Sequence, residues 1–294
     1  MKIQKIIPDW AFATFEHWRA HGRLPNVLRP TTFCEKVLHR ILFDRREWLT
    51  DTTDKYRVRA YVEERLGAEV LPKLLHVTDD PATIPFDDLP SRFVVKPTHA
   101  SGWFEAIHDK ASLDREKLIA QCREWLARSF YEVHREWAYK NIMPRILVQE
   151  FINDGNAALP TDYRFYVFGG KPELISVDRE QNDVACCNFY DLSWRRLELS
   201  NGRPEIAGDL PPPPHLREMI QAATLLARGT AFVRIDFFDT EAQFYFAEMT
   251  WTPNCGFAAF KPPFYERHFG DLWRLDRASP RLPVPAARSL RSVP

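Results

Sequence analysis

The chain has 294 residues, of which 45% are hydrophobic and 27% charged, a composition typical of a globular protein and too apolar for a disordered one. Forty Lys and Arg residues balance forty Asp and Glu residues, so the formal net charge is zero. This argues against a protein that holds nucleic acid or an anionic membrane by bulk charge. No run approaches the roughly 18–20 apolar residues of a membrane span, and the apolar stretch at the N-terminus is too short for a signal peptide.

The first 70 residues are expected to be mainly helical. Two stretches with apolar residues at helical spacing lie near residues 10–18 and 35–48. A third helix fits residues 55–66 and ends at Gly67, a natural C-cap. The four prolines of residues 68–90 then indicate a connecting loop with a short strand or two.

The pattern changes at residue 92. The run RFVVK, residues 92–96, is short, apolar and bounded by prolines, which predicts a buried strand. Residues 103–108 fit its hairpin partner. A helix is expected over residues 113–129 and another strand over residues 145–152.

The second half of the chain is predicted to contain paired strands and one helix. Two glycines, a lysine and a proline at 169–172 form a hairpin turn by composition. The expected elements are strands at 163–168 and 173–179, a hairpin at 188–199, a helix at 215–228 and strands at 231–238 and 243–249. Antiparallel pairs with helices between them indicate an α+β fold rather than a regular βαβ alternation.

The five cysteines show no C-x-x-C spacing, so neither a zinc ribbon nor a disulfide framework is indicated. We therefore expect a reduced, cytoplasmic protein. Neither G-x-G-x-x-G nor G-x-x-x-x-G-K-[ST] occurs in the sequence, so a Rossmann site and a P-loop are not supported.

Candidate chemistry begins with Arg234, Asp236 and Glu248, which lie on two consecutive predicted strands. Arg234 and Asp236 share strand parity, and a tight hairpin brings Glu248 beside them on one face. Paired carboxylates suit Mg²⁺, which usually takes one or two of them plus substrate phosphates, and arginine suits the phosphate itself. An exposed hairpin with alternating polar residues is the alternative explanation.

Lys96 ends the buried strand, and its ammonium needs an anion there unless it reaches solvent along its own stem. The small residues that follow, 97–102, form a loop whose backbone N–H groups suit phosphate oxygens.

Three weaker signals accompany Lys96 and the loop that follows it. Residues 148–152 leave a strand with an edge that suits an adenine ring, Asp162 and Arg164 open a strand whose hairpin partner ends at Arg179, and Lys55 begins a helix. The hairpin is expected to point both arginines toward one cavity. Ordinary core strands, surface arginines and a solvated lysine remain the alternatives.

The order of these signals carries more weight than any one of them. A lysine, a strand-ending lysine with a small-residue loop, Q-E-F-I, D-x-R and R-x-D…E follow one another, as in ATP-grasp enzymes, which the chain resembles over about residues 51–260. VRIDFF…YFAEMTWTPNCGF is similar to the D-Ala–D-Ala ligase pattern, and DYRFYVFGGK resembles a strand of RimK-like ligases.

A closer resemblance covers about residues 27–270. TFCEKVLHRILFDRR…DKYRVRAYV, FVVKPTHASGW, DYRFYVFGGKPELISVDRE and FAEMTWTPNCGF resemble the TupA-like branch, which is associated with teichuronopeptide and surface-polysaccharide biosynthesis. The resemblance implies an ATP-grasp fold, in which two α+β subdomains grip ATP, preceded by a short helical N-terminal region. The expected boundaries are 1–70 for the helical region, 71–155 and 156–278 for the small and large subdomains, and 279–294 for a flexible tail.

The resemblance also implies residue roles. Lys55 and Lys96 would hold the α- and β-phosphates, and Arg234 would neutralise the transferring γ-phosphoryl group. The implied nucleotide-binding residues are Lys55, Lys96, His99, Ser101, Gly102, Gln149, Glu150 and Ile152, the catalytic ones Arg234, Arg164, Asp162 and Arg179, and the Mg²⁺ ligands Asp236, Glu248, Thr250 and Asn254.

Three positions depart from the superfamily pattern. Thr250 stands where a metal-binding Asn is usual, Asn254 stands where a Gly follows Pro253, and Ala100 replaces a Gly of the phosphate loop. These departures put a second Mg²⁺ site in question.

The implied activity is that of an ATP- and Mg²⁺-dependent carboxylate–amine ligase working through an acyl phosphate. It would join an amino acid or amine to a carboxylate, such as a uronic acid of a surface glycan. The alternatives are a kinase-like phosphotransferase, although no H-R-D loop precedes Asp236-Phe237-Phe238, and an ATP-binding protein of a glycosyltransferase pathway without ligase activity.

Overall fold

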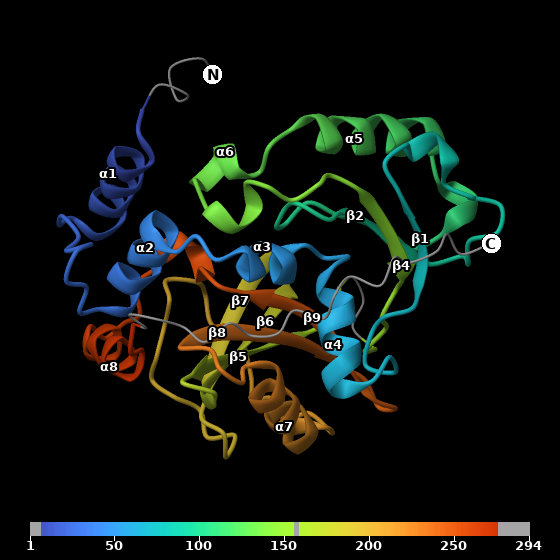
Figure 1. Cartoon of the computed structure of the whole chain (residues 1–294). Helices are drawn as coiled ribbons and strands as arrows, with labels where there is room; N and C mark the ends of the chain where they lie inside the picture. The colour runs from blue at the N-terminus through green and yellow to red at the C-terminus, as the bar shows by residue number, and fades with distance from the viewer. Residues whose placement is uncertain (1–6, 156–158, 276–294) are drawn as a thin grey trace.

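The structure, a computed structural model, describes residues 7–155 and 159–275. Two antiparallel sheets form two subdomains, and helices lie around them (Figure 1). The predicted tail at 279–294 lies outside the described residues. No helix in the described ranges is long and apolar enough to cross a membrane.

Four helices precede the first strand: α1 (Asp9–His21), α2 (Phe33–Phe43), α3 (Glu47–Thr53) and α4 (Val58–Leu66). The predicted helical start is confirmed. Helix α2 begins at a capping box formed by Thr32 and Glu35, and α4 ends at Gly67, whose φ of 92° suits glycine.

The small subdomain is a four-stranded sheet in the order β1-β4-β2-β3. Its strands are β1 (Leu74–Thr78), β2 (Phe93–Pro97), β3 (Glu105–Ile107) and β4 (Ile146–Glu150). Helix α5 (Arg115–Ala127) covers one face and packs its buried Leu118, Cys122 and Trp125 against strands β2 and β4 (Figure 1). The short helix α6 (Tyr131–His134) and a 3-10 turn (Trp137–Tyr139) then lead back toward the large subdomain.

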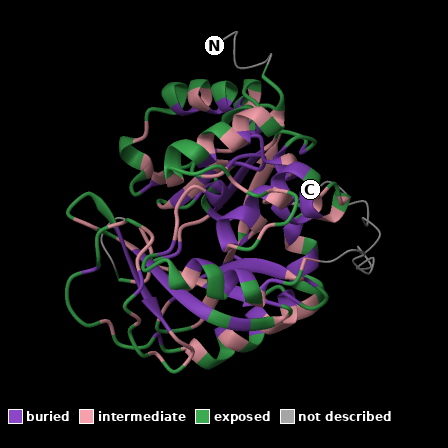
Figure 2. Ribbon diagram, turned by 90° about the vertical axis from the view of Figure 1, so that its left-hand side faces the viewer, coloured by how far each residue is buried: buried purple, intermediate pink, exposed green. Residues whose placement is uncertain are grey.

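The large subdomain is a five-stranded sheet in the order β7-β6-β5-β8-β9. Its strands are β5 (Asp162–Phe168), β6 (Lys171–Gln181), β7 (Val184–Tyr190), β8 (Phe232–Asp239) and β9 (Phe244–Thr250). Strands β5 to β8 are buried along most of their length, whereas the edge strand β9 is mainly half-buried (Figure 2). Two helices complete this part, α7 (Leu216–Leu226) and α8 (Phe264–Leu272).

The two faces of the large sheet are used differently. Odd-numbered residues of β5 and β8, such as Phe165 and Ile235, form an apolar core with α4 and α7. On the opposite face, Tyr166, Phe168 and Phe232 pack against α2 and α8. Because α2 and α8 cover only that end of the face, its other end is left for the polar residues described below.

The hairpin predicted at 188–199 is present, but its first strand starts before residue 188. The strand after β6 begins at Val184, and the turn is made by Asn182 and Asp183, which both have positive φ, 52° and 60°. Asn and Asp tolerate this conformation, and a turn of this type matches the twist of a hairpin. At the end of β7 the chain turns back, so that Tyr190 bridges Arg196. The backbone N–H of Leu197 donates to the carbonyl of Phe189 at 2.9 Å, and that of Asp191 to the carbonyl of Arg195 at 3.0 Å.

The segment before α2 is held by the buried carboxylate of Glu35. It accepts hydrogen bonds from the backbone N–H groups of Asn26, Thr31 and Thr32 at 3.0–3.3 Å, and from Arg23 Nη1 at 2.7 Å. Burial alone would raise the pKa of Glu35, but these donors outweigh it and lower the pKa to about 2. The ionised form is therefore the one that the fold stabilises.

Glu35→Gln should consequently destabilise the protein most above pH 5. A carboxylate with a lowered pKa adds stability above its unfolded pKa of 4.5, and this stability disappears as the pH falls toward 2. The shift corresponds to about 3 kcal/mol. Urea unfolding of the wild type and Glu35→Gln between pH 7 and about pH 3 should show their difference shrinking in acid. The exposed Glu64→Gln is the control, and a pH-independent difference for Glu35→Gln would contradict this assignment.

Candidate active site

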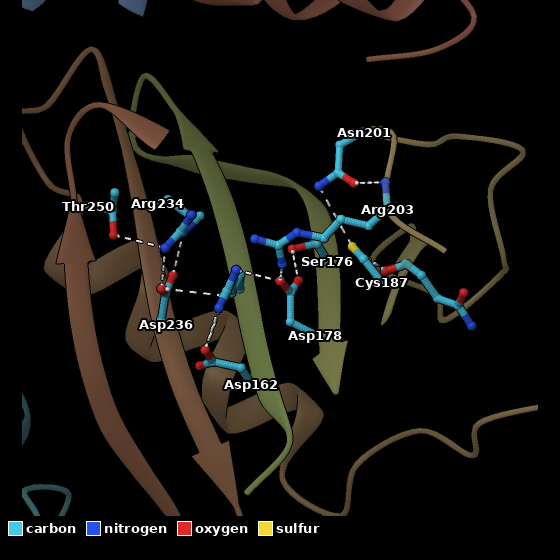
Figure 3. A network of polar contacts seen from close by, with 11 residues as sticks. Asp162, Ser176, Asp178, Cys187, Asn201, Arg203, Arg234, Asp236 and Thr250 are labelled. Carbon is cyan, nitrogen blue, oxygen red and sulfur yellow. Dashed lines mark hydrogen bonds and ion pairs between the residues drawn. The ribbon is translucent and has the colours of Figure 1, made fainter. Parts of the chain in front are cut away.

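A row of charged side chains crosses the open end of the large sheet (Figure 3). Strand register creates it, since Asp162 lies opposite Asp178, Arg164 opposite Asp236, and Asp236 opposite Glu248. Directly paired residues point to the same face of a sheet. The prediction that Arg234, Asp236 and Glu248 share one face is therefore confirmed.

A β-bulge makes this pairing possible. Phe237 pairs with Phe246 but Asp236 pairs with Glu248, which leaves Ala247 without a partner. If the strands paired without this bulge, Ala247 would lie opposite Asp236, and Glu248 would point to the other face of the sheet. The bulge thus aims the second carboxylate into the site.

Arg234 and Asp236 are both buried and form a two-point ion pair. Arg234 Nε and Nη2 donate to the two carboxylate oxygens at 2.8 and 2.6 Å, and Nη2 also donates to Thr250 Oγ1 at 3.0 Å. Burial raises the pKa of Asp236 to about 6, although Arg234 and Arg164 oppose the shift. A further cation near this carboxylate would favour its charged form.

Arg164 joins the middle of the row. Its guanidinium donates to Asp162 Oδ2 at 2.7 and 3.1 Å and to Asp178 Oδ2 at 2.5 Å, and Nε lies 3.7 Å from Asp236 Oδ2. Three carboxylates on three strands are therefore linked by one arginine. Asp162 Oδ1 is buried and has no hydrogen-bond partner within residues 7–155 and 159–275, so the row still has an acceptor to offer.

The two candidate lysines lie where the subdomains meet. The backbone N–H of Lys55 donates to the carbonyl of Thr98, which ties the start of α4 to the end of β2 and so brings Lys55 toward Lys96. Lys55 Nζ lies 3.5 Å from Glu248 Oε1, yet it is buried and makes no hydrogen bond to any residue that the structure describes. Burial would raise the pKa of Glu248, but Lys55, Arg234 and Lys96 lower it overall. The carboxylate is thus held ionised among cations.

The loop after β2 turns its residues to different sides. His99 is buried, and its Nε2 lies 3.1 Å from the carbonyl oxygens of both Trp125 and Arg128, so the imidazole faces the end of α5 rather than the lysines. Gly102 has a φ of 72°, and the space that a Cβ would occupy there is open. The backbone around Ser101 and Gly102 is therefore the part of the predicted phosphate loop that remains exposed to a ligand.

The predicted adenine-binding segment borders a cavity of about 490 Å³. Residues 150–155 line one side of it, and Tyr245 and the turn between β8 and β9 line the other. Gln149 is buried within β4. The Glu150 carboxylate accepts a hydrogen bond from the backbone N–H of Lys73, so this edge is already anchored to the start of β1.

Of the four candidate metal ligands, Asp236 and Glu248 lie opposite each other on neighbouring strands. No group of three or more His, Cys, Asp or Glu residues within the described ranges could hold a metal by itself. Asp236 and Glu248 nevertheless fit Mg²⁺ bound together with nucleotide phosphates, because such sites need only one or two carboxylates. Thr250 Oγ1 is engaged by Arg234, and Asn254 lies exposed on a left-handed turn with a φ of 49°.

The prediction that Arg164 and Arg179 face one cavity is wrong. Asp162 pairs with Asp178 and Arg164 with Ser176, so even-numbered residues of β6 share the face of Arg164 and Arg179 points to the other. A bulge in this pairing, between Tyr166 and Val167, shifts the register by one residue. Arg179 is accordingly left out of the site proposed below.

Sequence reasoning also missed residues that the fold brings to the site. Asp178 bridges Arg164 and Arg203, although Arg203 lies on the long loop after β7. Glu136, beside the 3-10 turn, is buried and accepts a hydrogen bond from Thr252 Oγ1, which connects the two subdomains near Glu248. Only the parity of Asp178 with Ser176 was visible in the sequence, because the other contacts join distant segments.

Comparisons with known proteins agree with this architecture. The family described as TupA-like ATPgrasp matches residues 35–274. No curated protein matches.

Among solved structures, a D-alanine–D-alanine ligase from Bacillus anthracis complexed with ATP is 18% identical, with a TM-score of 0.42 over 70% of this chain and 57% of the ligase. A second structure of a ligase of this name from the same organism is 17% identical, with a TM-score of 0.47 over 76% of this chain and 67% of the ligase. An ADP complex of purK, N5-carboxyaminoimidazole ribonucleotide synthetase, is 12% identical, with a TM-score of 0.44 over 70% of this chain and 46% of that one.

The chain thus spans little more than half of the first of these ligases. The family match, in contrast, includes both sheets and the charged row on the large sheet. The chain belongs to the TupA-like ATP-grasp family.

Proposed function

We propose that the protein is an ATP- and Mg²⁺-dependent carboxylate–amine ligase that forms ADP. The observation that carries the proposal is a cluster of charged residues between the subdomains, formed by Lys55, Lys96, Arg234, Asp236 and Glu248. Lys55 Nζ is buried in it and has no hydrogen-bond partner in the described part of the chain. A buried ammonium of this kind is stabilised by an anionic ligand. Phosphoryl transfer needs such cations and carboxylates and no protein nucleophile.

In this proposal the nucleotide lies between the subdomains. Lys55 and Lys96 contact the α- and β-phosphates, and the backbone of the loop with Ser101 and Gly102 closes over them. The remaining contacts proposed for the nucleotide are the adenine contacts of Gln149, Glu150 and Ile152, with His99 supporting the loop from behind. Asp236 and Glu248 would hold Mg²⁺, with Thr250 or Asn254 supplying any further ligand, and the ion would neutralise phosphate charge.

The reaction then needs two displacements. An oxygen of the substrate carboxylate attacks the γ-phosphorus and ADP leaves, which gives an acyl phosphate. An amine attacks the acyl carbon, phosphate leaves, and the amide forms as the nitrogen loses a proton. Arg234 and Arg164 face the reacting groups and balance the charge that develops on the transferred phosphoryl oxygens. Enclosure between the subdomains protects the acyl phosphate from water.

The substrates that we propose are an amino acid or amine and a carboxylate, such as the uronic acid of a surface polysaccharide, joined in the cytoplasm. ADP release should be measured with ATP and Mg²⁺ against a panel of amino acids, each with and without glucuronate or galacturonate. ADP that requires both partners supports the ligase. If ADP forms with a single hydroxyl-bearing partner and leaves a stable phosphorylated product, the protein is a kinase and not a ligase. Failure of every tested pair of substrates to form ADP would contradict the proposal.

Nucleotide binding should weaken in alkaline solution because of Lys96. Burial and neighbouring Lys55 lower the pKa of Lys96 to about 7, while Glu248 and Asp162 partly oppose the shift and Arg59 adds to it. Above pH 7 the free protein must take up a proton to bind phosphate, so the affinity for ATP should fall up to about tenfold per pH unit.

Calorimetric titration with ATP between pH 7.5 and 9, about 1.5 units, checks this expectation in a range where ATP itself is ionised. In Lys96→Arg the cation stays charged, so the slope should flatten. An affinity that is constant in the wild type, or equally steep in Lys96→Arg, would remove Lys96 from the phosphate site.

A further inference from the structure

Arg203 reaches the charged row from outside the sheet (Figure 3). It lies on the loop between β7 and α7, and its Nη1 donates to Asp178 Oδ2. No other side-chain hydrogen bond of Arg203 occurs within the described part of the chain, and the side chain is 36% exposed. One edge of the planar Arg203 guanidinium is thus fixed by Asp178, while its remaining donors face the charged row.

The backbone on both sides of Arg203 is anchored. Ser200 and Lys261 exchange two backbone hydrogen bonds of 2.9 and 2.7 Å, and the N–H of Cys187 donates to the carbonyl of Pro204 at 2.8 Å. The N–H of Arg203 itself donates to Asn201 Oδ1 at 3.2 Å. The loop therefore presents the guanidinium in a set position, which lowers the entropic cost of binding a ligand there.

Its position relative to the reacting centre is set by the sheet. Asp178 on β6 and Asp236 on β8 are separated by β5 alone, so about 10 Å divide Arg203's anchor from the carboxylate proposed to hold Mg²⁺. Arg164 fills the interval, since it contacts both carboxylates. A substrate group bound by Arg203 would therefore lie beside the phosphoryl-transfer site and not within it.

An unused acceptor lies on the neighbouring strand. Asp162 is the direct cross-strand partner of Asp178, so their Cα atoms lie about 5 Å apart. Asp162 Oδ1 is itself buried and lacks a hydrogen-bond donor among the described residues, although the Asp162 side chain as a whole is 23% exposed. Within the described part of the chain, Asp162 Oδ1 is thus an unpaired acceptor, and Arg203, held by Asp178 on the neighbouring strand, has unpaired donors. The two groups match the amino and carboxylate groups of an amino acid.

We propose that Arg203 binds the non-reacting carboxylate of the amine-bearing substrate while Asp162 Oδ1 accepts from its amino group, so that the amine is an amino acid. The inference rests on the proposed ligase function and narrows its second substrate. Arg203 is then a specificity-determining residue, because the planar fork of arginine binds a carboxylate at two points.

The test compares amino acids with amines that lack the carboxylate, such as L-alanine with ethylamine and L-lysine with cadaverine, in the ADP-release assay with glucuronate. The wild type should prefer the amino acid roughly 100-fold in kcat/KM, because absence of the carboxylate leaves charged groups unpaired. Arg203→Gln should raise the KM for the amino acid roughly 10- to 100-fold, with the KM for ATP within about twofold. Arg203→Lys keeps the charge but loses the planar fork, so its KM for the amino acid should lie between those of the wild type and Arg203→Gln.

Arg195→Gln is the matched control, since Arg195 lies on the same loop, is 81% exposed and pairs, among the described residues, only with Asp191. Its kinetics should equal those of the wild type. Equal use of amines and amino acids by the wild type, or an unchanged amino-acid KM in Arg203→Gln with a normal melting temperature, would overturn the inference.

Direct binding separates the inference from the ligase proposal. Calorimetric titration of the same amino acids into protein saturated with ADP and Mg²⁺ needs no turnover. Binding that is lost in Arg203→Gln would keep the subsite even if no pair of substrates forms ADP. Absence of amino-acid binding by the wild type would overturn the subsite, whether or not ATP is hydrolysed.

Discussion

Glu248→Gln should lower the rate of ADP formation by roughly 100- to 1000-fold, the effect of removing one electrostatic contact to the transferring group. Glu248 lies opposite Asp236, and four neighbouring cations keep it ionised. Glutamine keeps the shape of the side chain but loses the charge. The site would then keep only one carboxylate for Mg²⁺, and Lys55 would lose its anionic neighbour at 3.5 Å. Lys96→Ala should be as damaging, because the phosphates lose a cation.

Initial rates of ADP release at saturating ATP test this expectation. Glu173→Gln is the control, since Glu173 is an exposed glutamate at the far end of β6. Melting temperatures separate lost chemistry from lost structure, and Glu248→Asp, which retains the charge at a shorter reach, should recover part of the rate. Full activity in Glu248→Gln or in Lys96→Ala would remove that residue from the site.

The core of the site was predictable because strand periodicity carries the information. Arg234 and Asp236 alternate with apolar residues on a strand, and a short turn returns the chain to Glu248. Local sequence is sufficient for the hairpin itself, whereas the bulge that turns Glu248 to the face of Asp236 is not visible in it. The helical start of the chain and the paired β2 and β3 were predictable for the same reason, since each rests on contacts between near neighbours.

Bulges limited the same reasoning elsewhere. Arg179 would share the face of Arg164 if β5 and β6 paired without interruption, because the turn at Gly169 and Gly170 sets that register. The shift between Tyr166 and Val167 moves every later residue of β6 to the opposite face. Nothing in the sequence near Glu173 marks this extra residue. A bulge between β8 and β9 had the opposite outcome and brought Glu248 to the site.

Long-range contacts were beyond the sequence altogether. Arg203 reaches Asp178 across 25 positions, and Thr252 reaches Glu136 across 116. His99 was expected near phosphate because of its place in the loop, but the end of α5 binds its ring. Such contacts depend on how loops pack against the sheets, and no periodic pattern encodes that packing.

The helices at the start of the chain pack into the large subdomain. Phe33 of α2 lies 5.1 Å from Phe232 and 5.7 Å from Trp273 between ring centroids, and Lys36 Nζ donates to the carbonyls of Gly270 and Trp273. Buried Glu266 of α8 accepts from the N–H of Cys34 at 3.0 Å. Helices α2 and α8 therefore close one end of the sheet face whose other end carries the charged row.

Gly270→Ala should destabilise the protein by about 3 kcal/mol, at the upper end of what overpacking usually costs. A Cβ at this position would lie 2.1 Å from the backbone carbonyl oxygen of Thr31 and 3.0 Å from the carbonyl carbon of Thr32. Backbone atoms of a capped helix start cannot move aside as a flexible side chain does, so α8 must shift away from α2. Alanine favours a helix over glycine by about 1 kcal/mol, and the clash must exceed this gain.

Thermal and urea unfolding measure the effect, with Asp271→Ala as the control on the next position of α8. Asp271 is exposed and pairs only with Arg267 within the described residues, so its removal should change stability by less than about 0.5 kcal/mol. If Gly270→Ala unfolds like the wild type or later, α8 does not press on α2 as described. If it is destabilised as expected, ATP binding should weaken as well, because the face that carries Arg234 and Asp236 is continuous with the one that these helices close.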